Sequence, residues 1–94
     1  MSGDTFESVW DAIENTAAEA ESMKLRAKLM MALEEHISRQ GWTQAEAARR
    51  FGVTQPRISD LVRGKINLFG LDTLVNMAVA AGLHVEMQIG VEAA

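Results

Sequence analysis

Apolar residues recur along the first part of the chain at the spacing of one helix face. Positions i, i+3, i+4 and i+7 are apolar, and this period predicts an amphipathic helix over residues 5–14. Acidic residues lie opposite the apolar ones. The apolar stripe consists of Phe6, Val9, Trp10 and Ile13.

A second and longer helix is expected over residues 17–40. Thr16 and Glu19 have the spacing of a capping box, in which two side chains bond to free backbone N–H groups at a helix start. We therefore expect the first helix to end at Asn15 and the second to end at Gly41. The inward stripe of the second helix consists of Leu25, Leu29, Leu33 and Ile37, widened by Met30 and Ala32.

Residues 43–65, TQAEAARRFGVTQPRISDLVRGK, predict two short helices joined by a tight turn. Thr43 begins the first helix, and Glu46 completes a capping box with it. Gly52 stands at the turn, where a positive φ costs glycine little, and Thr54 caps the second helix. This arrangement is the helix-turn-helix. Its inward residues are expected to be Ala48, Phe51, Ile58, Leu61 and Val62.

The pattern changes towards the C-terminus. A loop at 66–70 leads to one more helix, which ends at Gly82. From 84 to 89 polar and apolar residues then alternate, which predicts a half-buried β-strand. A single strand needs a ladder partner, so we expect it to pair with the same strand of a second copy in a two-fold dimer. The expected interface residues are Val85, Met87 and Ile89.

Together these elements predict an all-α, phage-repressor-like helix-turn-helix bundle of about five helices with one short C-terminal β-strand. The 94 residues suit a single domain. Within it, 1–22 are an acidic N-terminal helical extension, 43–65 are the helix-turn-helix and 84–89 are the dimerisation strand.

The charge distribution favours a nucleic-acid partner although the net charge is −4. Residues 1–22 hold six acidic and no basic side chains, whereas residues 23–65 hold all nine basic side chains against four acidic ones. The motif therefore lies in a segment with a local charge of +5, and the local field governs an approaching phosphate backbone. There is no cysteine, membrane span or signal peptide, so we expect a cytoplasmic protein without a membrane partner.

The second motif helix carries the candidate chemistry, because such a helix enters the major groove of double-stranded DNA. Gln55 has the amide that pairs with adenine, and Arg63 can bind phosphates at the helix end. Each of these side chains could instead belong to a solvated polar face. For Arg49 and Arg50 that alternative is preferred, because they compensate the helix dipole. The candidate DNA-binding residues are Gln44, Thr54, Gln55, Arg57, Ser59, Arg63 and Lys65.

Other chemistry is not expected. His36 and His84 are far apart in sequence and lack a second ligand at metal-binding spacing. The chain has no phosphate-binding glycine loop, no Ser-His-Asp arrangement and no thiol nucleophile. We therefore expect neither a metal site, nor a cofactor, nor an enzyme.

Three stretches, TQAEAARRFGV, TQPRISDLVRGK and LDTLVNMAVAAGLHVEMQI, resemble in order and spacing the Xre/Cro-like helix-turn-helix proteins. Within that family they resemble the HigA-type antitoxins of bacterial type II toxin–antitoxin pairs. The resemblance runs from Phe6 to Ile89 and implies a dimeric repressor that binds an operator at its own promoter. It also implies a partner toxin, usually a RelE-like ribonuclease. The residues at the family's DNA-facing positions are Gln44, Thr54, Gln55, Arg57 and Arg63.

Three functions stay open at this point: a repressor that also neutralises a toxin, a stand-alone Xre-family repressor, and a helical protein-interaction module without DNA binding. For a toxin, the candidate contact is the N-terminal stripe of Phe6, Val9, Trp10 and Ile13. The alternative, which we prefer, packs that stripe on the chain's own long helix or across the dimer.

Overall fold

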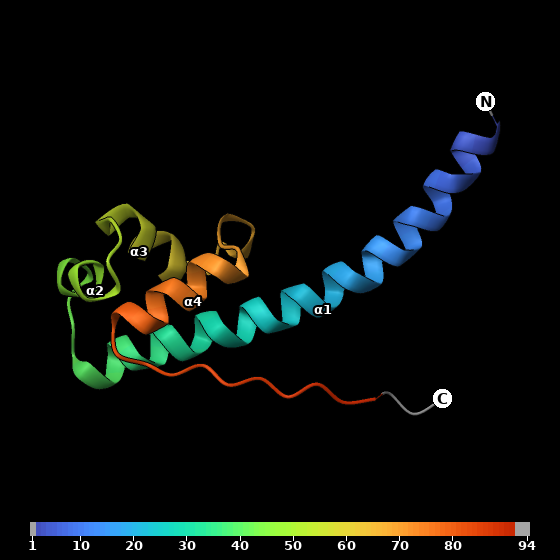
Figure 1. Cartoon of the computed structure of the whole chain (residues 1–94). Helices are drawn as coiled ribbons and strands as arrows, with labels where there is room; N and C mark the ends of the chain where they lie inside the picture. The colour runs from blue at the N-terminus through green and yellow to red at the C-terminus, as the bar shows by residue number, and fades with distance from the viewer. Residues whose placement is uncertain (1, 92–94) are drawn as a thin grey trace.

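The computed structural model describes the backbone of residues 2–91 and the side chains of residues 16–91. The described residues contain four α-helices and one 3-10 turn. Helices α2, α3 and α4 gather against the C-terminal half of α1, while its N-terminal half projects beyond them (Figure 1). The predicted all-helical helix-turn-helix fold is confirmed. In chain order the elements are α1 (Ser2–Gln40), α2 (Gln44–Phe51), α3 (Gln55–Val62), η1 (Ile66–Leu68) and α4 (Leu71–Ala80).

The predicted break at Asn15 is wrong, because α1 is one continuous helix of 39 residues. Residues 4–40 contain neither glycine nor proline, and the segment AAEAE at 17–21 consists of strong helix formers. A capping pattern begins a helix only where the preceding backbone leaves helical geometry, and nothing in this sequence forces it to leave. Hence the described residues form four α-helices rather than about five.

The continuity of α1 also bears on its N-terminal stripe. Because a single helix cannot fold back on itself, residues 5–14 cannot pack on residues 17–40 of the same chain, and that part of the preferred alternative is wrong. The side chains of Phe6, Val9, Trp10 and Ile13 lie outside the side chains that the structure describes. No described helix is both long and apolar enough to cross a bilayer.

One hydrophobic core joins the four helices. Most of the predicted inward residues are confirmed, but Val62 is 49% exposed, Leu25 is 37% exposed and Ala32 is exposed as well. Val62 is the last residue of the eight-residue α3. Leu25 lies one helical turn before Leu29, which is the first large side chain of α1 that packs on the core. The largest fully buried side chains are Leu33, Phe51, Ile58, Leu61, Phe69, Leu74 and Met77.

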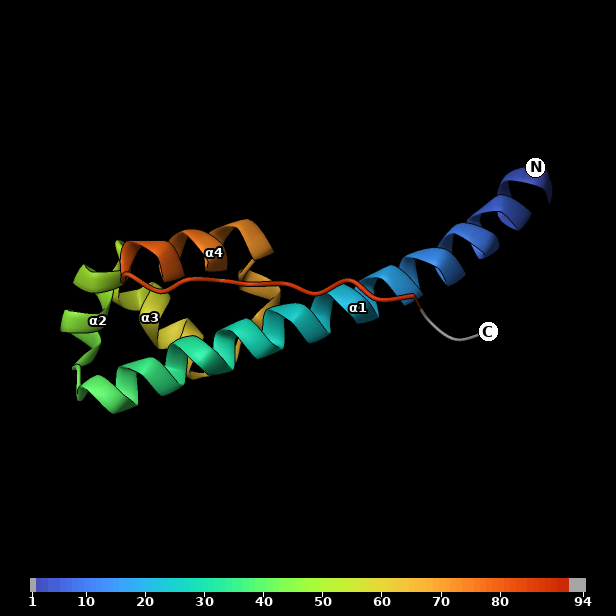
Figure 2. The same cartoon turned by 60° about the horizontal axis from the view of Figure 1, so that its bottom comes forward.

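Residues 83–91, which we call the arm, run in extended conformation alongside α1 (Figures 1 and 2). The predicted strand at 84–89 is not formed, because no other segment of the described residues offers it a ladder partner. Of the expected interface residues, Val85 packs against the core, while Met87 is 61% and Ile89 is 90% exposed. The arm is therefore a single extended segment with one end anchored.

Candidate nucleic-acid interface

Side-chain caps and one glycine set the relation between α2 and α3. Thr43 Oγ1 accepts a hydrogen bond from the backbone N–H of Glu46 at 3.1 Å, and Thr54 Oγ1 accepts one from the N–H of Arg57 at 3.4 Å. Gly52 ends α2 with φ 70° and ψ 32°, the left-handed conformation that other residues adopt only at a cost. The predicted turn and both predicted N-caps are confirmed.

Helix α3 is held by its inward face and presents its other face to solvent. Ile58 and Leu61 are completely buried, which fixes the rotation of α3 about its axis. As a consequence, Gln55 at the first position of α3 is exposed. The predicted DNA-binding residues that are exposed are Gln44, Thr54, Gln55, Arg63 and Lys65.

Four of these exposed residues form two groups. Thr54 and Gln55 stand together at the start of α3, and Arg63 and Lys65 follow its end. Gln44, at the first position of α2, belongs to a separate helix end. The arrangement places the amide of Gln55 at the leading end of α3 and the cations at the trailing end, as a groove-reading helix requires.

Arg57 is directed towards the chain itself rather than towards solvent. Its Nη1 donates a hydrogen bond to the carbonyl of Leu68 at 2.9 Å, and its guanidinium carbon lies 5.4 Å from the ring centre of Phe69. Phe69 is 1% exposed, so Arg57 covers part of the core. In this structure Arg57 therefore links α3 to the segment that leads to α4.

Ser59 and Lys65 are also less free than the sequence indicates. Ser59 is half-buried. Lys65 Nζ lies 3.9 Å from Asp60 Oδ1, a weak and partly exposed ion pair. Asp60 is thus paired with a lysine.

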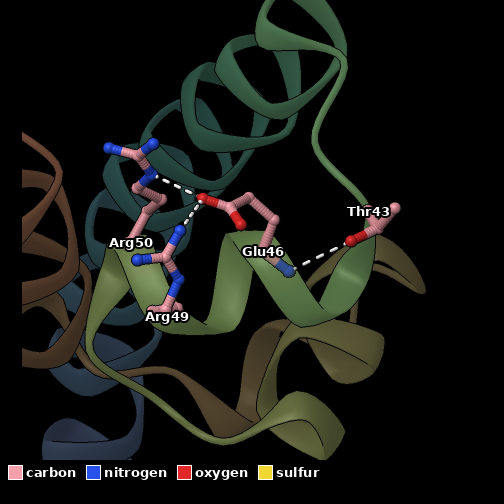
Figure 3. Close-up of polar contacts among 4 residues, drawn as sticks. All are labelled: Thr43, Glu46, Arg49 and Arg50. Atoms are coloured by element: carbon pink, nitrogen blue, oxygen red, sulfur yellow. Dashed lines mark hydrogen bonds and ion pairs between the residues drawn. The ribbon is translucent and has the colours of Figure 1, made fainter.

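Glu46 organises the outer surface of α2 (Figure 3). Its Oε2 accepts a hydrogen bond from Arg49 at 2.5 Å and another from Arg50 at 2.7 Å. Arg49 first, and then Arg50, hold the pKa of the Glu46 carboxyl below its ordinary value, and the same carboxylate raises the pKa of Arg49. Only half of the predicted capping box is present, because the Glu46 side chain binds these arginines instead of reaching back to Thr43.

Trp42, which the sequence did not single out, joins α1 to α2. Its ring meets Phe51 edge-on at 5.9 Å and His36 edge-on at 5.1 Å between ring centres. The guanidinium of Arg50 lies 5.4 Å from the same ring. The signal available in the sequence was a tryptophan directly after a helix-ending glycine.

Arg26 is a second residue whose role appears only in the folded chain. Its Nη1 donates to the carbonyl of Ile66 at 3.3 Å, although the two residues are 40 positions apart. Arg26 holds η1 from the side of α1, and Arg57 holds it from the side of α3. Two arginines on different helices therefore fix the segment that follows the candidate DNA-reading helix.

Comparisons with known proteins agree with this architecture. A family profile described as a helix-turn-helix domain matches residues 13–90. A solved structure described as an XRE family transcriptional regulator is 32% identical, with a TM-score of 0.72, and the match covers 79% of this chain and 83% of that chain. A search of curated proteins finds no match to this chain.

Proposed function

Because the chain belongs to the helix-turn-helix domain family, we propose that it regulates transcription by placing α3 in the major groove of an operator. One observation carries the proposal: burial of Ile58 and Leu61 fixes α3 with Gln55 exposed at its leading end. The similar XRE family regulator supports the same conclusion.

The exposed residues suggest a division of work. Gln55 reads an adenine through its N6 and N7 atoms. Arg63 and Lys65 bind phosphates and set the position of α3 without specifying sequence. Thr54 and Gln44 add contacts at the two helix starts. Arg57 acts from within, by holding η1, and Ser59 is a lesser contact because it is half-buried.

We further propose that the protein represses as a homodimer. Two copies related by a two-fold axis present two α3 helices to adjacent half-sites, and a palindromic operator about one helical turn in half-site spacing is the expected target. Two weak contacts joined in this way bind far more tightly than either alone.

DNA selected from a random pool by the purified protein tests this function. Gln55→Ala should relax the preference at one base pair of the selected site, at a cost of about 1–3 kcal/mol. Arg63→Ala should weaken all sequences alike and lower the slope of log affinity against log salt by about 0.9.

Two exposed residues outside the motif serve as matched controls, Gln40→Ala for the glutamine and Arg39→Ala for the arginine. If the motif variants bind DNA no differently from these controls, DNA reading by α3 is wrong. The protein-interaction module then becomes the better account.

A second candidate function is that of an antitoxin. The N-terminal half of α1 projects beyond the other helices (Figure 1), and its sequence carries an apolar stripe with acidic residues opposite. Such a helix suits a groove on a basic protein, as a RelE-like ribonuclease toxin would offer.

Removal of residues 1–22 tests the antitoxin. The shortened chain should keep DNA binding, because every described core residue lies at or after position 29. It should no longer bind or neutralise a toxin encoded by the neighbouring gene. Full neutralisation by the shortened chain would contradict this contact, and the absence of any such toxin would favour a stand-alone repressor.

A further inference from the structure

An open groove of about 660 Å³ lies between α1, α4 and the arm. Its walls are mostly apolar, and several wall residues remain partly exposed, among them Leu25 at 37% and Val75 at 36%. Apolar walls on a small domain favour a cover that removes them from water. The apolar lining residues include Leu25, Leu29, Ala32, Leu71, Val75 and Val85, and four charged or polar residues line the groove as well.

The arm beside this groove has one apolar side whose exposure rises along its length. Val85 is half-buried, Met87 is 61% exposed, Ile89 is 90% exposed and Val91 is fully exposed. Beyond Leu83, the described part of the arm makes no backbone–backbone hydrogen bond. An extended segment with free backbone groups and one apolar side is a template for a second strand.

We infer that two copies pair their arms antiparallel about a two-fold axis at Met87, so that Ile89 of each copy covers Val85 and the groove of the other. This inference rests on the proposed homodimer and gives it a register. Residues directly opposite one another in an antiparallel pair lie on the same face. An axis between Met87 and Gln88 would place apolar residues opposite polar ones. The axis therefore lies midway between the two copies of a single residue.

The side chains that each register sets opposite one another decide which residue lies on the axis. An axis at Glu86 would set two carboxylates directly opposite each other, which is destabilising. An axis at Gln88 would set the smaller Val91, rather than Ile89, opposite Val85 beside the groove, and would cover less apolar surface there. With the axis at Met87, Ile89 lies opposite Val85, and Glu86 lies opposite Gln88 of the second copy.

The groove explains why such a pair of strands would be stable. Two strands alone are marginal in water and need a surface that covers their apolar side. In the Met87 register, Ile89 of the second copy lies beside Val85, which itself lines the groove with Leu29 and Ala32. The exposed end of each arm is then buried against α1 of the other copy. Within its own chain, Ile89 at this end is 90% exposed.

Single cysteines test the register, because the natural chain contains none. Directly opposite residues have Cβ atoms about 4.5–5.5 Å apart, close to the separation that a disulfide needs. On mild oxidation, Met87→Cys should form a disulfide-linked dimer at least tenfold faster than Gln88→Cys or Ile89→Cys. An equal mixture of Val85→Cys and Ile89→Cys should give the mixed dimer in preference to either self-dimer.

Ser38→Cys, exposed on α1, gives the rate of random collision. If Met87→Cys is no faster than Ser38→Cys, the arms do not pair, even where sedimentation reports a dimer. Fastest coupling at Gln88→Cys would place the axis elsewhere and overturn this register.

DNA binding by the reduced variants separates the two proposals. Specific coupling at Met87→Cys without any DNA binding would leave the arm pairing standing and overturn the proposed regulator. Sequence-specific DNA binding without specific coupling at Met87→Cys would leave the proposed regulator standing and overturn the arm pairing.

Discussion

Replacement of Arg57 by alanine is expected to destabilise the fold and to leave the contacts with DNA phosphates intact. The guanidinium donates to the Leu68 carbonyl at 2.9 Å and lies 5.4 Å from the Phe69 ring centre. The first contact ties α3 to the segment before α4, and the second covers a core side chain that is 1% exposed. Alanine removes both contacts and leaves the α3 backbone unchanged.

The size of the effect follows from these two contacts. A hydrogen bond from a charged donor contributes about 1.5–3 kcal/mol when well shielded, and a cation–π contact at an exposed site about 0.5–1 kcal/mol. Arg57 is only half-buried and its hydrogen bond is exposed to solvent, so we place both contributions below these ranges and expect a loss of about 1.5 kcal/mol in total. In a domain of this size that loss lowers Tm by about 6–12 °C.

Two measurements check this expectation. Thermal melting without DNA should show the fall in Tm for Arg57→Ala, whereas the exposed control Arg63→Ala should change stability by less than about 0.5 kcal/mol. The salt dependence of DNA binding should show the opposite order, with an unchanged slope for Arg57→Ala and a slope lower by about 0.9 for Arg63→Ala. A natural melting curve together with a reduced slope for Arg57→Ala would refute the reasoning.

Three further outcomes can be measured by unfolding in urea or by heat. Gly52→Ala should cost about 1–2 kcal/mol, because the left-handed backbone is strained for alanine while its Cβ would meet Ala80 Cβ at an ordinary 3.8 Å; an unchanged urea midpoint would contradict this. Leu61→Ala should lose about 2–5 kcal/mol, whereas Val62→Ala, at an exposed position, should lose less than about 1 kcal/mol; similar losses for the two would show that α3 is rotated. Glu46→Gln should lower Tm at pH 7. The folded pKa of Glu46 is below its ordinary value of 4.5, so the stabilisation by its carboxylate is present above that value and is lost as the pH falls through the folded pKa. The Tm values of the natural protein and of Glu46→Gln should therefore converge in acid. A Tm difference that stays constant with pH would exclude the carboxylate as the cause.

The sequence predicts the α2–α3 unit well because its signals are local. Thr43 and Thr54 bond to backbone groups three positions away, and Gly52 satisfies a conformational need of its own backbone. The period of apolar residues identifies Ile58 and Leu61 without knowledge of any partner. Such signals act within one helical turn and need no tertiary structure.

The features that the sequence does not predict depend on distant partners. Arg57 binds a carbonyl 11 positions away, and Arg26 binds one 40 positions away. On the surface of a helix both residues look like solvated cations, so no local pattern distinguishes them from Arg63. Phe69 offered a weak signal, since a large aromatic residue between two helices is often an anchor for the loop.

The Asn15 boundary shows a different limit. Thr16 and Glu19 have the spacing of a helix start, but the same residues are tolerated inside a helix. Which outcome occurs depends on whether residues 5–14 continue helically, and alanine and glutamate on both sides favour continuation. A capping pattern without a glycine or proline before it is therefore poor grounds for dividing a helix.

The length of α1 has a geometric consequence for any partner held near its start. At 1.5 Å per residue, position 10 lies roughly 30 Å along the axis from position 30, where the helix enters the core. A protein bound there would be held at that distance from the helices that pack on the core. The length of α1 therefore separates its first turns from the α2–α3 unit by several turns of exposed helix.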